Sequence, residues 1–439
     1  MTEGKLQHPS FSELVRVSAR IGCLSFGGPA GQIALMHREL VEERRWVDEE
    51  EYLQALNLCH LLPGPEAQQL ATWAGWQLHG WKGGLVAGGL FVLPGAAVML
   101  ALSVLYGLAA DLQWFAALFL GIKAAVLAII AQALLRIAGR ALATGFQRGL
   151  AVAAFAALFL FAASFPLVVL AALALGAIAG AKRPALLALK PAGPVVDDGR
   201  APWAASLTAF VVWGAIWAAP MMAVWLLLGP GHVLWDIGLF FSQLAVVTFG
   251  GAYAVLAYMA QEAVAGYGWL EPGEMADGLG LAETTPGPLI MVTQFVGYLG
   301  AFRAPEPFTP LVAGVLGAVL TTWVTFAPCF LWIFAFAPWM VRIQRARWLK
   351  GGLAGVTAAV VGVIANLGLW FGLHVLFTRV ALTEAGPLRL QVPDLATFDW
   401  GAALIALVAA GVIFGLRWGI IRTLVVAAAM GLALGWRAA

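Results

Sequence analysis

Charged side chains are scarce in this sequence of 439 residues. Only 11% of the residues are Asp, Glu, Lys or Arg, whereas 62% are hydrophobic. Soluble proteins carry about 25% charged residues, so a chain this apolar needs lipid as part of its solvent. The formal net charge of +2 comes from scattered residues, so no basic patch indicates nucleic acid as a partner. The composition therefore predicts a membrane protein.

Residues that hold metals or form covalent intermediates are also few. The three cysteines, Cys23, Cys59 and Cys329, have no metal-binding spacing and lie in apolar segments, so we interpret them as packed thiols. The six histidines have no ligand spacing, and no Ser/His/Asp triad or phosphate-binding glycine loop can be read. The sequence therefore predicts no metal site, no cofactor and no enzyme. A membrane-embedded enzyme would need paired carboxylates or histidines at membrane depth, and none stands out.

Glycine is plentiful, with 51 residues, and its most regular use marks an internal duplication. Two motifs each occur twice, as Ser25-Phe26-Gly27-Gly28 with Pro63-Gly64-Pro65 and as Thr248-Phe249-Gly250-Gly251 with Pro286-Gly287-Pro288. Phe26 and Pro63 are 37 positions apart, as are Phe249 and Pro286, and the copies differ by 223 positions. A later block, in which Lys123 matches Thr357, repeats at an offset of 234 because of an insertion near residues 303–307. Independent tracts rarely keep such a register, so the sequence predicts a repeat.

The predicted fold is an all-α polytopic membrane protein with two inverted-topology repeats and about 13 membrane segments. The first repeat covers residues 1–181, a polar connector and one extra transmembrane helix cover 182–230, and the second repeat covers 231–439. Positive residues cluster near 136–148, 182–190, 342–350 and 417–422. We expect these clusters and the N-terminus to be cytoplasmic. The single extra helix then inverts the second copy.

Each repeat is expected to open with two discontinuous helices, broken or re-entrant at the motifs, and to continue with four plainer spans. The broken helices are expected at residues 10–44 and 48–77, and again at 232–262 and 271–300. The plainer spans are expected at residues 84–110, 113–136, 149–165 and 167–181, and again at 311–338, 351–377, 400–416 and 418–436.

The interrupted helices predict an anion-binding site. A break leaves free N–H groups and a positive dipole end on the second half-helix, and inverted repeats with such helices are typical of secondary transporters. Kinks that serve only packing are the alternative, which four breaks in matched register make less favoured. The candidate substrate-binding residues lie in or beside the breaks: Ser25, Phe26, Gly27, Gly28, Pro63, Gly64, Pro65, Gln68, Gln69, Thr248, Phe249, Gly250, Gly251, Thr284, Thr285, Pro286, Gly287, Pro288 and Gln294.

Three ionisable residues are expected at membrane depth. Lys123 lies near the middle of its span, where a charge costs about 3 kcal/mol or more. We interpret it as a substrate-binding countercharge for the anion, and the alternatives are a snorkelling lysine or a pair with a buried glutamate. Glu66 and Glu283 flank the Pro-Gly-Pro motifs and are candidates for proton coupling. Solvent exposure at a cavity rim, or pairing with Lys123 or Arg20, is the alternative for both glutamates.

Phe-Gly-Gly followed 37 residues later by Pro-Gly-Pro, twice in one chain, resembles the long-chain members of the chromate ion transporter superfamily. Residues 61–70 and 91–95 are similar to that family's first half, and residues 249–253 and 285–288 to its second half. The resemblance implies a secondary transporter in the bacterial inner membrane that exports chromate, a tetrahedral dianion, and confers chromate resistance. A homodimer is left open.

The two halves differ in their motifs. Ala252 stands where the first copy has Pro29, and Leu289 where it has Glu66. These differences argue against a strictly symmetric site. Sulfate or another oxyanion is the alternative substrate because charge and shape nearly coincide, and an anion channel is the alternative mechanism.

Overall fold

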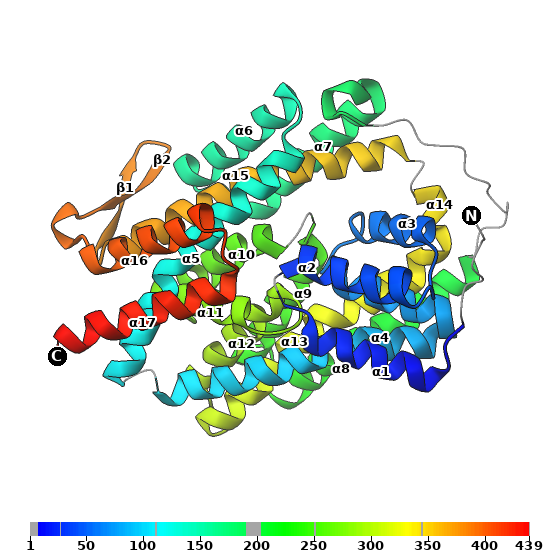
Figure 1. Ribbon diagram of the computed structural model, residues 1–439, viewed down its shortest axis with the longest axis horizontal. Coiled ribbons are helices and arrows are strands. Elements are labelled where there is room, and N and C mark those ends of the chain that lie inside the picture. The colour runs from blue at the N-terminus through cyan, green and yellow to red at the C-terminus, as the bar shows by residue number, and fades with distance from the viewer. Residues whose placement is uncertain are drawn as a thin grey trace. The chain divides into compact units, whose positions relative to one another are not determined.

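The computed structural model describes residues 8–26, 28–109, 112–189, 203–249, 252–343 and 346–438 (Figure 1). Three predicted site residues, Gly27, Gly250 and Gly251, lie outside the described residues, as does most of the predicted connector. Helices dominate the described chain, which agrees with the predicted helical membrane protein. The elements are described below in chain order.

In the first half of the chain, the described residues form helices joined by turns. The elements are α1 (Phe11–Leu24), α2 (Gly28–His37), η1 (Arg38–Glu43), α3 (Glu49–Cys59), α4 (Glu66–Ala109), α5 (Gln113–Ala141), α6 (Gly145–Phe161), α7 (Phe165–Lys182) and η2 (Pro184–Leu187), followed by α8 (Trp203–Leu227).

The second half repeats this pattern and adds one small sheet. Its elements are α9 (Val233–Val247), α10 (Ala252–Gln261), η3 (Glu262–Gly266), α11 (Pro272–Thr284), η4 (Leu289–Met291), α12 (Val292–Arg303), α13 (Pro310–Phe336), η5 (Ala337–Trp339), α14 (Met340–Ile343), α15 (Arg347–Leu376), β1 (Val380–Ala385), β2 (Leu388–Pro393), η6 (Leu395–Thr397), α16 (Trp400–Ala410), η7 (Gly411–Gly415) and α17 (Ile420–Ala438).

The helices stop and restart at the duplicated motifs. α1 gives way to α2 at Ser25–Gly28, and α4 begins directly after Pro65. In the second copy the interruptions follow Val247 and Thr284. Proline has no N–H to donate and glycine shields the backbone poorly, so the helical hydrogen bonding ends there. The predicted interruptions are confirmed, whereas full crossing or re-entry stays a prediction.

α4 contains a second discontinuity. His79 and Gly80 have non-helical backbone angles, with φ +60° at Gly80, so the 44-residue element is two helices joined at a kink. This agrees with the predicted change from a broken helix ending at residue 77 to a span beginning near residue 84.

Several helices have the length and composition of membrane spans. Among the described residues, six qualify: α4, α5, α7, α8, α13 with η5, and α15. Shorter apolar stretches include α6, α9, α12, α16 and α17. The chain is therefore a multi-pass membrane protein, and the count of about 13 segments stays a prediction. The antiparallel hairpin β1–β2 was not predicted. It lies in the connection from α15 to α16 and turns at Gly386, where φ is +62°.

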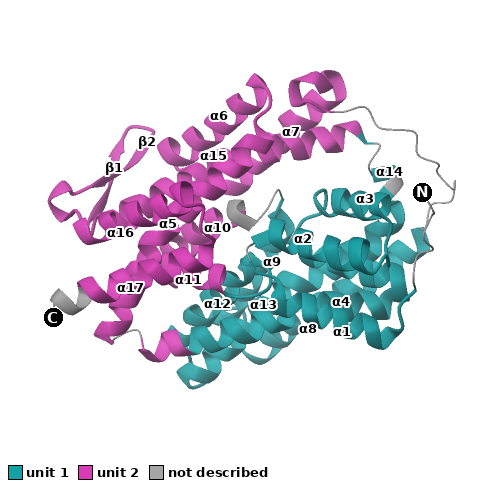
Figure 2. Cartoon of the chain, in the orientation of Figure 1, with its two compact units in different colours: residues 1–104, 191–252, 285–346 teal, residues 105–190, 253–284, 347–439 magenta. Residues whose placement is uncertain are grey.

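The chain forms two compact units, each built from separate stretches of sequence (Figure 2). Unit 1 comprises Met1–Val104, Pro191–Ala252 and Thr285–Ala346, and unit 2 comprises Leu105–Lys190, Tyr253–Thr284 and Arg347–Ala439. Each unit therefore takes segments from both predicted repeats. The predicted boundaries describe copies of sequence rather than units of packing, and they stay predictions.

Small residues bring helices together within unit 2. A Cβ added to Gly176 of α7 would lie 2.3 Å from the carbonyl oxygen of Gly351 in α15, and one on Gly180 would lie 2.6 Å from the Gly351 Cα. Gly355, one turn further along α15, would meet the carbonyl of Ala172 at 2.5 Å. Both helices thus carry glycines four residues apart, a spacing that allows close backbone packing in membranes.

Gly176→Ala should lower the free energy of unfolding by about 1–3 kcal/mol, because the new methyl group has no space against α15. The matched control is Gly149→Ala in α6, where a Cβ would meet no heavy atom within 4 Å. Thermal unfolding of both purified variants in detergent measures the difference. Equal melting temperatures would contradict the proposed tight contact.

Candidate functional site

The duplicated motifs are joined by two reciprocal hydrogen bonds inside unit 1. The Gly64 N–H donates to the Thr248 carbonyl at 2.8 Å, and the Gly287 N–H donates to the Ser25 carbonyl at 2.8 Å. The offset of 223 matches Ser25 with Thr248 and Gly64 with Gly287. The two bonds are therefore the same contact with the copies exchanged, as in an isologous, two-fold interface. These bonds join the second break to the third and the fourth to the first, and all four bonded residues lie in unit 1.

The ends of α1 and α9 also have the same local geometry. Ser25 Oγ donates to the Ile21 carbonyl at 2.6 Å, and Thr248 Oγ1 donates to the Leu244 carbonyl at 2.5 Å. The Phe26 and Phe249 N–H groups each donate two residues back, at 2.9 and 3.1 Å. In both copies a hydroxyl thus satisfies a carbonyl in the last helical turn.

The glycines between the prolines need a left-handed backbone. Gly64 has φ +113° and Gly287 has φ +86°, a region that residues with a Cβ rarely adopt. A Cβ on Gly64 would also lie 2.9 Å from Cys329 Sγ in α13. Near the other break, a Cβ on Gly95 of α4 would lie 2.3 Å from the Pro286 carbonyl oxygen. The breaks are therefore packed against α4 and α13.

The reciprocal bonds change which backbone donors remain available. The sequence analysis selected Gly64 and Gly287 as substrate-binding candidates, but their N–H groups are bonded to carbonyls, and proline has no N–H. The first bonds of the following helices come from Gln69 N–H to Pro65 and from Met291 N–H to Pro288, at 3.1 and 2.9 Å. The amides that precede Gln69 and Met291, at the N-termini of α4 and η4, have no acceptor within their own helix and are the candidate donors at these breaks.

Four buried glutamines surround the breaks. Gln32 Nε2 donates to the Gly287 carbonyl at 2.6 Å, and Gln69 Nε2 donates to the Pro63 carbonyl at 2.6 Å. Gln68 Nε2 donates to Thr72 Oγ1 at 3.1 Å, and Gln294 Nε2 donates to the Ala96 carbonyl at 3.0 Å. The Oε1 atoms of all four glutamines have no hydrogen-bond partner among the described residues. Because a side-chain amide can turn and exchange its donor for its acceptor, these groups can adapt to a polar ligand.

Gln32 was not predicted from the sequence. It lies one turn after Gly28, and this position on the restarted helix is the signal that could have identified it.

Carboxylates also lie near the breaks. Glu66 is 7% exposed in the first turn of α4, and its Oε1 is 3.6 Å from His60 Nδ1. Glu39, which the sequence analysis did not select, is 1% exposed and pairs with Arg44 and with Arg20, the latter at 3.7 Å. Arg20 is thus engaged by a carboxylate within unit 1.

The predicted site residues divide between the two units. Unit 1 contains those at the breaks: Ser25, Phe26, Gly28, Pro63, Gly64, Pro65, Glu66, Gln68, Gln69, Thr248, Phe249, Thr285, Pro286, Gly287, Pro288 and Gln294. Unit 2 contains Lys123, Glu283 and Thr284.

Lys123 lies on α5 in unit 2 and interacts electrostatically with Asp277 of α11. Asp277 was missed by the sequence analysis. An acidic residue within the largely apolar stretch 275–282 is the signal that could have identified it.

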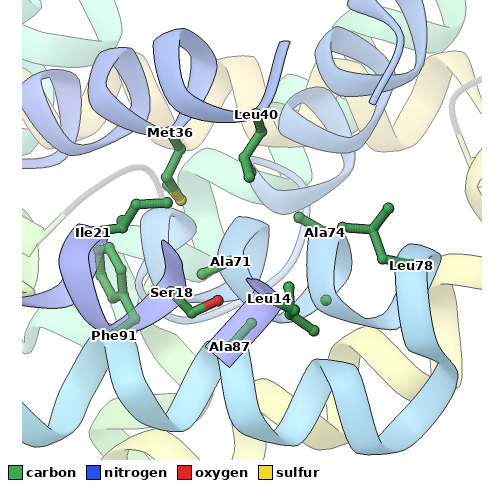
Figure 3. A pocket seen from close by; sticks show the side chains of 11 residues that line it. Leu14, Ser18, Ile21, Met36, Leu40, Ala71, Ala74, Leu78, Ala87 and Phe91 are labelled. Atoms are coloured by element: carbon green, nitrogen blue, oxygen red, sulfur yellow. The ribbon is translucent and has the colours of Figure 1, made fainter. Parts of the chain in front are cut away.

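A small cavity in unit 1 has a different character. It lies between α1, α2, η1 and α4, and the labelled side chains in Figure 3 point into it. Ser18 supplies the only polar side chain among the lining residues, which include Leu14, Met36 and Phe91. An oxyanion loses its hydration at such a surface without gaining donors. We therefore assign this cavity to packing.

Interlocked helix breaks within a multi-pass bundle are typical of membrane transporters. Residues 12–180 and 235–435 match the protein family described as chromate transporter. The match covers most of the chain in two blocks, one in each predicted repeat. The chain therefore belongs to the chromate transporter family.

Relatives named as chromate transport proteins are similar in sequence to this chain over most of their length. A "probable chromate transport protein" of Synechococcus elongatus is 31% identical over 88% of this chain and 93% of its own length. A "chromate transport protein" of Pseudomonas aeruginosa is 33% identical over 81% of this chain and 79% of its own. An uncharacterized transporter of Methanocaldococcus jannaschii is 24% identical over 86% of this chain. No solved structure matches the chain.

Gly287→Ala should impair both stability and transport, because it places a Cβ on a left-handed backbone beside α4. We expect a loss of about 1–2 kcal/mol in the free energy of unfolding. Gly89→Ala in α4 is the control, since a Cβ there meets nothing within 4 Å. The two variants can be compared by thermal unfolding and by anion flux in vesicles. Wild-type behaviour of Gly287→Ala would contradict the structural role of this break.

Proposed function

We propose that this chain is a secondary transporter that exports chromate across the bacterial inner membrane and thereby confers chromate resistance. The observation that carries the proposal is the membership in the chromate transporter family over both halves of the chain. The relatives named as chromate transport proteins add support over four fifths of the chain or more. The buried, interlocked breaks supply the local architecture that such a transporter needs.

The two copies are proposed to be inverted repeats that alternate access to one substrate site. The exchanged pair of bonds, Gly64 to Thr248 and Gly287 to Ser25, supports a two-fold relation between the copies. α8 separates them as a single additional span. One extra crossing reverses the direction of everything that follows, so the second copy would run opposite to the first.

The substrate is proposed to be held by donors at the breaks. Chromate is a tetrahedral dianion, and leaving water is costly unless hydrogen-bond donors replace the hydration on several sides. The first-turn amides of α4 and η4 and the side-chain amides of Gln68, Gln69 and Gln294 are suited to this task. Lys123 is proposed as a countercharge that the anion meets during transport. Glu66 and Glu283 are proposed as coupling residues where a proton takes part.

The membrane potential can drive this export. Moving two negative charges out of a cell whose interior is negative releases about 4.6 kcal/mol per 100 mV. That energy supports an outward gradient on the order of a thousandfold. Export is therefore proposed to be electrogenic, with no strict requirement for a coupled proton.

Purified protein in vesicles tests this energetic proposal. With a clamped potential and no pH gradient, we expect chromate to accumulate on the positive side. Vesicles without protein are the control. Absence of flux under these conditions, with flux restored by a pH gradient, would contradict the electrogenic proposal. Competition by sulfate in the same assay decides between chromate and the alternative oxyanion.

Lys123→Ala should weaken chromate binding by about 10-fold or more, since it removes a half-buried positive charge that attracts the anion. Lys82→Ala is the matched control, because Lys82 is an exposed lysine of α4. Half-saturation concentrations for chromate flux in both variants, at equal expression, measure the effect. Equal half-saturation concentrations in Lys123→Ala and the wild type would contradict a role in anion binding and indicate that Lys123 is structural.

A further inference from the structure

Asp277 is a buried carboxylate that has no role in the transport function proposed above. Its side chain lies on α11 in unit 2 and is 4% exposed. The Tyr106 hydroxyl donates to Asp277 Oδ2 at 2.8 Å, and the Tyr106 ring packs edge-on against Phe115 and Phe119 of α5. Asp277 Oδ1 has no hydrogen-bond partner among the described residues. One oxygen is thus held in place, and the other is free to interact with a charge.

Lys123 is the positively charged residue that can balance the charge of Asp277. Lys123 lies within α5, one of the helices long and apolar enough to cross a membrane. Its ammonium reaches the first turn of α11, 3.6 Å from where a Cβ of Gly273 would lie. Gly273 is one turn before Asp277 on α11. The Lys123 ammonium and the Asp277 carboxylate interact electrostatically. A lysine within a span requires such compensation because an unpaired charge there is costly.

One further charged group acts on Asp277. Glu274 is partly exposed, and its Oε2 accepts the Glu271 N–H at 2.8 Å, at the start of α11. α15 and α17 also pack against α11. Lys123, Tyr106 and Glu274 are the groups whose charge or hydrogen bond acts most directly on Asp277. Asp277 is 4% exposed, whereas Glu274 is partly exposed.

Comparison of the two copies links the charges. The offset of 223 matches Asp277 with Gln54, and the offset of 234 matches Lys123 with Thr357. The two charges lie in different copies, yet both are replaced by neutral residues at the matching positions. With the copies exchanged, the positions of Lys123 and Asp277 correspond to those of Thr357 and Gln54, and neither of these carries a charge. This is expected if each charge is there to balance the other.

We propose that Asp277 is the resting counterion of Lys123 and sets the affinity of the transporter for its anion. With no anion bound, the Asp277 carboxylate balances the Lys123 ammonium. A bound oxyanion takes over this role, so that substrate and Asp277 compete for the same charge. The proposal rests on the function proposed for Lys123 above, and it makes Asp277 a positioning residue that does not contact the substrate.

The competition has opposite effects on binding and turnover. Without the carboxylate, Lys123 is free for the anion, and binding becomes tighter. The unloaded transporter must then return across the membrane with an unbalanced lysine, which slows net transport. Exchange of bound anion for bound anion avoids the unloaded state, so exchange is largely spared.

Asp277→Asn tests this in vesicles loaded with radiolabelled chromate. We expect a half-saturation concentration for chromate at least about fivefold lower than in the wild type, the low end of typical coupling between sites. Net efflux should fall by a similar factor, while chromate–chromate exchange stays within about twofold. Glu274→Gln is the matched control and should leave all three quantities within about twofold.

Each other result of this experiment decides against the proposal. Unchanged or weaker chromate affinity in Asp277→Asn, or a larger effect of Glu274→Gln, would overturn it. An equal loss of efflux and exchange at full expression would also overturn it, because that pattern indicates a general structural role.

Folding is tested separately from transport. If Asp277→Asn is unstable, the double variant Lys123→Gln/Asp277→Asn should regain thermal stability, because neither charge then remains unbalanced. Failure of the double variant to recover stability would overturn the pairing. If the wild type moves no chromate or other oxyanion, the proposed function fails, whereas this thermal cycle still reports on the pair.

Discussion

The exchange of backbone hydrogen bonds between the two copies is the constraint on which the rest of unit 1 depends. Four interrupted helices in a membrane protein leave polar backbone groups that lipid cannot satisfy. The bonds from Gly64 to Thr248 and from Gly287 to Ser25 satisfy one N–H group and one carbonyl in each copy. They require a left-handed glycine in each copy, a carbonyl at the end of each preceding helix, and a Ser or Thr hydroxyl that satisfies the turn before it. The residues of the duplicated motifs meet these requirements in both copies.

The same constraint explains why the breaks differ from simple open anion sites. Two of the amides that helix breaks normally expose are used to hold the copies together. The remaining donors lie one step further along, in the first turns of α4 and η4, beside buried glutamines with unpaired oxygens. The glutamine amides beside the breaks can turn and carry no fixed positive charge, which fits the proposal that an anion is bound there and then released.

The sequence predicted the positions of the breaks because proline and glycine act locally. A missing N–H or Cβ ends a helix whatever surrounds it, so the ends of α1 and α9 could be placed in advance. The partners of those breaks could not, since the bond between Gly64 and Thr248 joins residues nearly two hundred positions apart. Gln32 and Asp277 were missed for a related reason. Their importance comes from burial and from neighbours on other helices. The division of each predicted repeat between the two units likewise depends on which helices pack together. Periodicity within one helix carries no information about its packing partners.

The glycine contact between α7 and α15 has a consequence for motion. Backbone atoms of the two helices meet at Gly176, Gly180 and Gly351 with no side chain between them. Shear, in which packed helices slide along each other, relies on flexible side chains that can change rotamer at the interface. A seam of backbone against backbone has no such adjustable layer. α7 and α15 should therefore move as one rigid body. Any conformational change in unit 2 during transport would then involve the other helices of that unit.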